Sequence, residues 1–166
     1  MPGWSYSVSG GGITVVNAVV TLVFINPIAS PNVGVRLVRG WVSQSQNATS
    51  AQQRVQMETQ VTAFPTLTSA TPAKLARSSA ASVITGGTAG AAGTAGINAS
   101  AEGAGSKTVI FDDAFNVLNG WLWVPTPAEV IELTAGFASG VGLYFPVAVT
   151  GGQTANWNFG LNYCEY

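Results

Sequence analysis

Histidine is absent from this chain of 166 residues, and charged residues make up 8% of it. Imidazole is the usual general base near neutral pH and a common metal ligand, so its absence removes the side chain most often used for chemistry. The single cysteine, Cys164, has no partner for an internal disulfide and no histidine to activate it as a nucleophile. We therefore expect no enzyme, no cofactor and no metal site.

Charge of either sign is scarce. Six basic and seven acidic residues give a formal net charge of -1, whereas charged residues make up about 25% of a typical soluble domain. The basic residues are spread along the chain, which argues against a nucleic-acid partner because phosphate binding needs clustered lysine and arginine. Such a surface is explained either by burial against other subunits or a scaffold, which we favour, or by an exterior rich in hydroxyl and amide groups.

Long hydrophobic runs are also lacking. The candidate for a membrane span, residues 13–25, is shorter than the about 20 residues that a spanning helix needs, and it contains Asn17. The start Met1-Pro2-Gly3-Trp4 has neither the basic beginning nor the apolar core of a secretory signal. We expect no leader peptide and no membrane partner.

Period-two alternation is the main pattern that the chain does contain. In residues 54–61 the odd positions suit a core and the even positions suit water, and residues 155–164 alternate aromatic or aliphatic side chains with small or polar ones. Arg36 and Arg39 have opposite parity in a third strand, which predicts a bulge or bend near Arg39-Gly40. Further strands are expected at residues 33–42, 108–117, 121–124, 129–133 and 141–149.

These strands, with no window of helical periodicity, predict an all-β fold. We expect an antiparallel β-sandwich, jelly-roll-like, with about eight strands in a single domain over residues 13–166. Residues 1–12 are expected to form an N-terminal arm that ends in a glycine hinge at residues 10–12.

The segment 65–106 contains no aromatic residue and is rich in alanine, glycine, serine and threonine. Such a composition cannot bury enough apolar area by itself to offset its ordering entropy. We expect one long internal loop here, either an arm that lies across a neighbouring subunit or an exposed mobile loop.

The strand expected within residues 13–25 is apolar on both faces. Such a strand is buried on both sides, and in a sandwich one face can meet the core while the other meets a neighbouring subunit. The residues that we assign to an oligomer interface on this basis are Val16, Val20, Leu22 and Phe24.

Aromatic residues supply the remaining candidate sites. Trp4 and Tyr6 share a face near the N-terminus, where a core role is less obvious, and we expect them to dock the protein onto a partner. Trp121 and Trp123 share a strand face and are candidates for stacking on sugars.

The chain resembles the small β-sandwich head decoration, or cement, proteins of tailed bacteriophages. The resemblance covers residues 54–166. It rests on the order of the strand around Arg54-Val55-Gln56, then Thr71-Pro72-Ala73-Lys74-Leu75, the alanine- and glycine-rich segment, Phe115-Asn116-Val117-Leu118-Asn119-Gly120-Trp121, Val124-Pro125-Thr126-Pro127 and a final aromatic strand. The first 50 residues match the family less clearly.

The resemblance implies a structural virion protein without enzymatic activity. Proteins of this kind are commonly trimeric and sit on the outer surface of the capsid, where major capsid protein subunits meet. We therefore expect a homotrimer that binds the assembled shell, with Trp4 and Tyr6 as the capsid-contact residues. The alternative is a glycan- or receptor-binding module of a phage fibre or tail, which would use Trp121 and Trp123.

Overall fold

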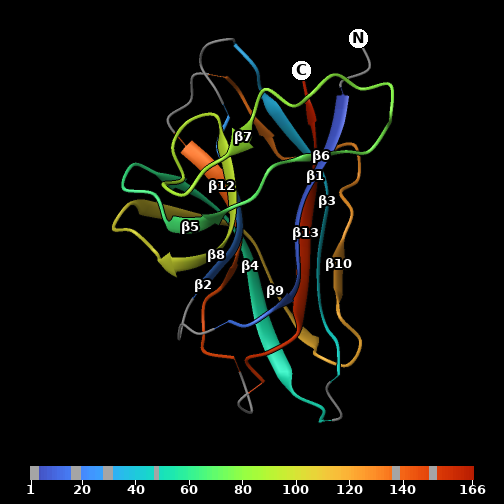
Figure 1. The fold of residues 1–166 in the computed structure, drawn as a ribbon. Coiled ribbons are helices and arrows are strands. Elements are labelled where there is room, and N and C mark those ends of the chain that lie inside the picture. Colours follow the sequence, from blue (N-terminus) through green and yellow to red (C-terminus); the bar gives the residue numbers. More distant parts are fainter. Residues whose placement is uncertain (1–3, 16–19, 28–31, 47–48, 136–138, 150–152) are drawn as a thin grey trace.

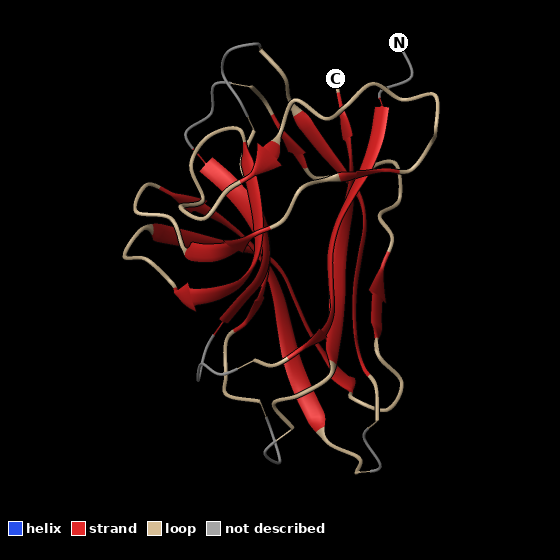
Figure 2. Cartoon of the chain, in the orientation of Figure 1, coloured by secondary structure: helices blue, strands red, loops and turns tan. Residues whose placement is uncertain are grey.

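Two β-sheets packed face to face make up the structure, a computed structural model (Figures 1 and 2). It describes residues 4–15, 20–27, 32–46, 49–135, 139–149 and 153–166, which form strands and no helix. The expected all-β sandwich is therefore confirmed, with 13 strands in place of about eight.

Sheet A consists, from edge to edge, of β10 (Trp121–Trp123), β3 (Val35–Gln44), β13 (Trp157–Glu165), β1 (Trp4–Ile13) and β6 (Ala73–Lys74), and β11 (Glu132–Leu133) also pairs with β3. Sheet B consists of β5 (Thr66–Ser69), β8 (Thr94–Ala101), β2 (Val20–Ile25), β12 (Ser139–Phe145), β4 (Gln52–Val61) and β9 (Ser106–Asn116). The pairings are antiparallel, except that β7 (Thr85–Gly86) runs parallel to β8.

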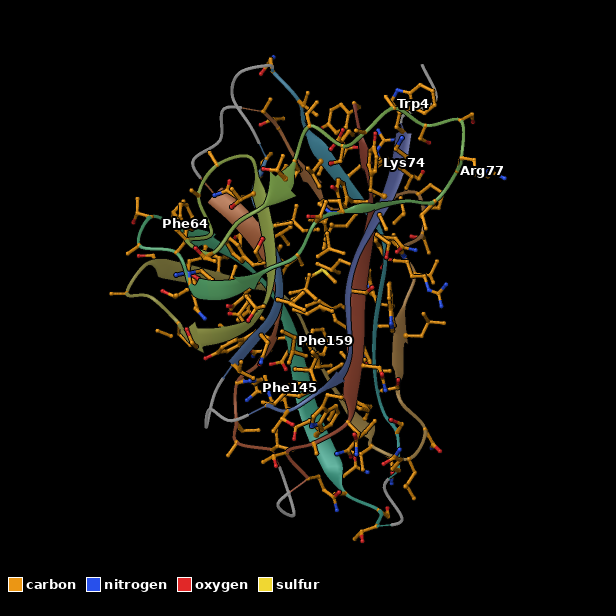
Figure 3. The ribbon with its side chains drawn as sticks, in the orientation of Figure 1. Trp4, Phe64, Lys74, Arg77, Phe145 and Phe159 are labelled. Atoms are coloured by element: carbon orange, nitrogen blue, oxygen red, sulfur yellow. The ribbon has the colours of Figure 1, made fainter. Side chains whose placement is uncertain are left out.

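The core lies between the sheets and follows the alternation in the sequence. Trp157, Phe159, Leu161 and Tyr163 of β13 are buried, while the residues between them, apart from Gly160, are only partly buried. The ring centroids of Trp157 and Phe145 lie 5.0 Å apart, edge to face, across the two sheets. Figure 3 shows Phe145 and Phe159 pointing into the space between the layers.

The predicted bulge in the third strand is confirmed. Asn162 lies opposite Arg39 and Tyr163 lies opposite Leu37, which leaves Val38 as the extra residue of β3. One extra residue reverses the side-chain parity, so Arg36 and Arg39 both reach solvent.

The predicted N-terminal arm is wrong for the described part, residues 4–12. These residues belong to β1, which is paired with β13 on one side and with β6 on the other. The three glycines at residues 10–12 contribute to an irregularity in the pairing with β13, and Gly12 adopts a positive φ of 65°. The alternation of serine with Trp4, Tyr6 and Val8 was an available signal for this strand, and Tyr6 and Val8 are buried.

The prediction of one long loop over residues 65–106 is also wrong. The pairing of β4 with β9 ends at Val61 and Ser106. After a short gap, β5, which continues β4, pairs with β8, which precedes β9 in the chain, and this second pairing starts at Thr66 and Ala101. They form one long ribbon with a sharp corner at residues 62–65 and 102–105. Gly105 is required at this corner, because a Cβ there would lie 1.9 Å from the Thr62 carbonyl oxygen.

The corner folds the chain back onto β2 and explains why that strand is apolar on both faces. The ring of Phe24 packs 5.7 Å from the ring of Phe64, and Val20, Leu22 and Phe24 are at most 1% exposed. Assignment of these three residues to an oligomer interface is therefore wrong, because all three are buried within the chain itself. The fourth, Val16, lies outside the described residues.

Candidate interaction surfaces and buried charge cluster

The two expected capsid-contact residues lie in different environments. Trp4 is 46% exposed at the start of β1, but Tyr6 is fully buried. The Tyr6 ring packs 5.6 Å from the Tyr163 ring, and its hydroxyl donates a hydrogen bond to the Ala80 carbonyl oxygen at 3.1 Å. Tyr6 is therefore a core residue, and its assignment as a contact residue is wrong.

Trp4 has exposed neighbours that the sequence did not single out. Leu75, just after β6, is 52% exposed, and its N–H donates to the Ser5 carbonyl oxygen. Figure 3 shows Trp4, Lys74 and Arg77 at the same end of the molecule. We call Trp4 and Leu75 the β1–β6 surface. It combines apolar area with two nearby cationic side chains.

A second apolar surface lies where the edge strands of the two sheets face each other. A groove of about 350 Å³ is lined by Ile110 and Phe111 of β9, Trp123 of β10, and Val124, Glu129 and Ile131 of the chain that follows. Ile110 is 43% exposed and Val124 is 62% exposed. We call this the β9–β10 groove. It lies at the β10 edge of sheet A, whereas the β1–β6 surface lies at the opposite edge.

Contacts between the sheets fix the walls of the groove. The Phe111 ring packs 6.1 Å from the Trp121 ring, and Trp121 Nε1 donates to Asp113 Oδ2 at 3.1 Å. On the opposite wall, Glu129 Oε2 accepts a hydrogen bond from Thr126 Oγ1 at 2.8 Å, which closes the turn after β10. The groove is thus built from strands and a hydrogen-bonded turn.

The two tryptophans expected to stack on sugars face the core. Trp121 and Trp123 are 8% and 9% exposed, and Leu122 between them is the exposed side chain. The glycan-binding role assigned to this pair is therefore wrong. Trp41 of β3 lies instead on the outer face of sheet A, half-buried, with the Arg39 guanidinium 5.4 Å from its ring centre.

An exposed ion pair spans the edge of sheet B. Arg54 Nε donates to Asp112 Oδ1 at 2.8 Å, and Gln56 Nε2 donates to Asp112 Oδ2 at 2.9 Å. These hydrogen bonds, first the one from Arg54, lower the pKa of Asp112 from 3.8 to about 2. The carboxylate is therefore ionised throughout the neutral and mildly acidic range.

A buried charge cluster occupies the ribbon corner, on the face of β4 that the alternation assigned to water. Lys107 Nζ lies 2.8 Å from Glu58 Oε1 and 2.9 Å from Glu102 Oε2, and it lies 3.8 Å from the centre of the Tyr144 ring. The Glu58 side chain is 3% exposed. Its predicted exposure on β4 is therefore wrong, because the corner folds over it.

Glu102 also receives hydrogen bonds from β2. Its Oε1 accepts from the Thr21 N–H at 2.6 Å, and its Oε2 accepts from Thr21 Oγ1 at 2.7 Å. Burial raises the pKa of Glu58 against the opposing effect of Lys107. Burial lowers the pKa of Lys107, but Glu58 and Glu102 outweigh it and raise the pKa above the ordinary value.

A second buried carboxylate, Glu165, holds down the segment between β6 and β7. It accepts a hydrogen bond from Ser82 Oγ at 2.5 Å and one from the Val83 N–H at 3.3 Å. Ser82 Oγ also lies 2.9 Å from the Tyr163 hydroxyl, and burial raises the pKa of that phenol. These hydrogen bonds satisfy the acceptor oxygens of the buried Glu165 carboxylate.

The described residues contain no group of three or more potential metal-ligating side chains, and they contain no helix that could cross a membrane. Comparisons of the chain with family models, with curated proteins and with solved structures found no significant match.

Proposed function

We propose that the protein is a structural virion component, a capsid decoration or cement protein that binds the assembled shell from outside. The β9–β10 groove is the observation that carries the proposal. Its exposed apolar side chains, Ile110 and Val124, belong to a chain with few charges to oppose protein contact. The order of sequence features that resembles phage decoration proteins supplies the partner class, a major capsid protein.

The position of the two apolar surfaces supports a bridging role. The β9–β10 groove and the β1–β6 surface lie at opposite edges of sheet A, so one molecule has separate areas for two neighbours. Binding only the assembled lattice stabilises it by mass action, and simultaneous contact with several subunits adds avidity. We extend the proposal to a homotrimer, whose interface excludes the buried Val20, Leu22 and Phe24.

Co-sedimentation with shells that lack the protein tests the groove. The variant Ile110→Ser/Val124→Ser should lose binding by at least about tenfold, because removing apolar anchors from an interface costs more than about 1 kcal/mol. The control is Val147→Ser, which alters a valine that is 42% exposed and does not line the groove. Equal binding by both variants would contradict the assignment of the groove.

Glycan or receptor binding is a second candidate function, now on different residues. Trp41, with Arg39 beside it, lines a hollow of about 190 Å³ on the outer face of sheet A. A partly exposed indole next to a hydrogen-bond donor suits stacking on a sugar ring. Quenching or a shift of tryptophan fluorescence on adding host polysaccharide, lost in Trp41→Phe, would favour this function.

A further inference from the structure

An amine and two carboxylates from three different segments of the chain meet at the ribbon corner. Lys107 brings a primary amine from β9, Glu58 brings a carboxylate from β4, and Glu102 brings another from the residue that follows β8. We propose that Lys107, Glu58 and Glu102 form an autocatalytic site, in which Lys107 Nζ condenses with the side-chain carboxyl of Glu102 to form an isopeptide bond. This inference is independent of the proposed function.

Contacts at Glu102 make it the electrophile. Its two oxygens accept hydrogen bonds from the Thr21 N–H and hydroxyl at 2.6 and 2.7 Å. Attack of an amine on the carboxyl carbon places negative charge on a carboxyl oxygen, and each of the two oxygens already has one Thr21 donor that stabilises the tetrahedral intermediate. Thr21 therefore acts as the oxyanion-stabilising residue.

Glu58 is placed to carry the protons. Its Oε1 lies 2.8 Å from Lys107 Nζ, and burial makes its protonated form easier to populate than that of an exposed glutamate. The Tyr144 ring, 3.8 Å from Nζ, covers the amine on another side. Because the two carboxylates favour the ammonium form of Lys107, the reaction begins with transfer of a proton from Nζ to Glu58.

The reaction balances without an external reagent. Glu58 takes a proton from the ammonium group and passes it to the Glu102 carboxylate, and the neutral amine then attacks the Glu102 carboxyl carbon. Glu58 takes a second proton from the nitrogen of the intermediate and gives it to the departing hydroxyl. A C–N bond forms, a C–O bond breaks, one water leaves and Glu58 returns to its starting state.

Fixed contact between the groups favours the amide over hydrolysis. Well-oriented groups in one molecule react as though their concentration were about 10⁵ M or higher. This effective concentration offsets the tendency of bulk water to hydrolyse the amide. The bond closes a small ring around residues 102–107. It thereby locks the corner that holds β8 against β2 and covers Phe24.

Intact mass under denaturing conditions is the direct test. The wild-type chain should be lighter than its sequence mass by one water per chain. Lys107→Arg keeps a cation between the carboxylates but lacks the reactive amine, and Glu58→Gln keeps the electrophile but lacks the proton carrier. Both variants should show their full sequence masses while circular dichroism shows the same β-sheet content. A wild-type chain at its full mass, after prolonged incubation at raised pH, would overturn the proposal.

Tryptic mapping distinguishes the two possible acceptors. Trypsin cleaves after free lysine and arginine, so an unmodified chain yields the peptides 55–74, 78–107 and 108–166. Linkage to Glu102 blocks cleavage after Lys107 and yields one peptide, 78–166, lighter by one water. A product in which peptide 55–74 is joined to peptide 78–166 would place the bond on Glu58 and overturn the assignment to Glu102.

Discussion

Glu102 and Thr21 are 81 residues apart in sequence, yet the Glu102 carboxylate accepts hydrogen bonds from both the N–H and the hydroxyl of Thr21. The contact joins the corner of the β4–β9 ribbon to the central strand β2. It ties the corner, where Phe64 packs on Phe24, to the middle of sheet B.

Removal of the Thr21 hydroxyl tests how much this contact stabilises the fold. Thr21→Val keeps the side-chain volume but removes a donor to a carboxylate, so the free energy of unfolding should fall by about 1–3 kcal/mol. Urea unfolding followed by tryptophan fluorescence measures it. The control Thr108→Val, at an exposed position of β9, should stay within about 0.5 kcal/mol of wild type. Equal stability of the two variants would contradict the role of the contact.

The corner itself should depend on glycine at position 105. A Cβ there would lie 1.9 Å from the Thr62 carbonyl oxygen, and both are backbone-bound atoms that cannot move freely. Gly105→Ala should therefore lower the free energy of unfolding by about 3 kcal/mol or more. Gly11→Ala is the comparison, because its Cβ would meet only the end of the Asn158 side chain at 3.3 Å. Thermal unfolding of both variants measures the difference, and a well-tolerated Gly105→Ala would refute the packing argument.

Acid sensitivity should depend on Asp112. Its pKa is lowered to about 2 in the fold, so the ionised carboxylate stabilises the native state above its ordinary pKa of 3.8. That contribution disappears as the pH falls from 3.8 toward 2. Asp112→Asn should flatten the stability–pH curve in this window. Glu132→Gln, which alters the exposed ion pair with Arg36, should leave the stability–pH curve as steep in this window as in the wild type. Identical stability–pH curves for the wild type and Asp112→Asn would contradict a stabilising role of the Arg54–Asp112 ion pair.

Trp4 is expected to be a contact residue for the shell. Because its side chain is half exposed at the start of β1, Trp4→Ala should keep the fold and the oligomer, as judged by circular dichroism and light scattering. Shell binding should weaken by at least about tenfold. Tyr166→Ala, a loss of another aromatic side chain that is 50% exposed, is the control. Unchanged shell binding by Trp4→Ala would rule out this contact.

The sequence predicted the strands that carry alternating side chains. Trp157, Phe159 and Leu161 are buried as the pattern required, and the parity of Arg36 and Arg39 revealed the bulge at Val38. Here one face of each strand meets the core, so burial and sequence period coincide. The period-two alternation within single strands was therefore enough to predict the fold class.

The ribbon corner and the strands β5 and β8 beyond it could not be predicted in this way. β8 consists mainly of small residues, and its Gly96 lies against Leu67 of β5 and pairs with Phe24 of β2. The buried charge cluster depends on the same fold-back, since Glu58 and Lys107 meet across β4 and β9, 49 residues apart. Alternation placed Glu58 in water because the strand alone cannot show that its polar face is covered.

The β9–β10 groove was missed for a related reason. Phe111 and Trp123 lie on different sheets, and only their packing shows that the two edges face each other. The adjacent apolar residues Val109 and Ile110 break the alternation of β9 and were an available signal for an exposed apolar edge.

The copy number of the protein in particles purified from its source tests the central claim most directly. Quantitative mass spectrometry would compare its abundance with that of the most abundant shell protein. A decoration protein that covers the shell should approach a one-to-one ratio. A handful of copies per particle, or none, would contradict the capsid role.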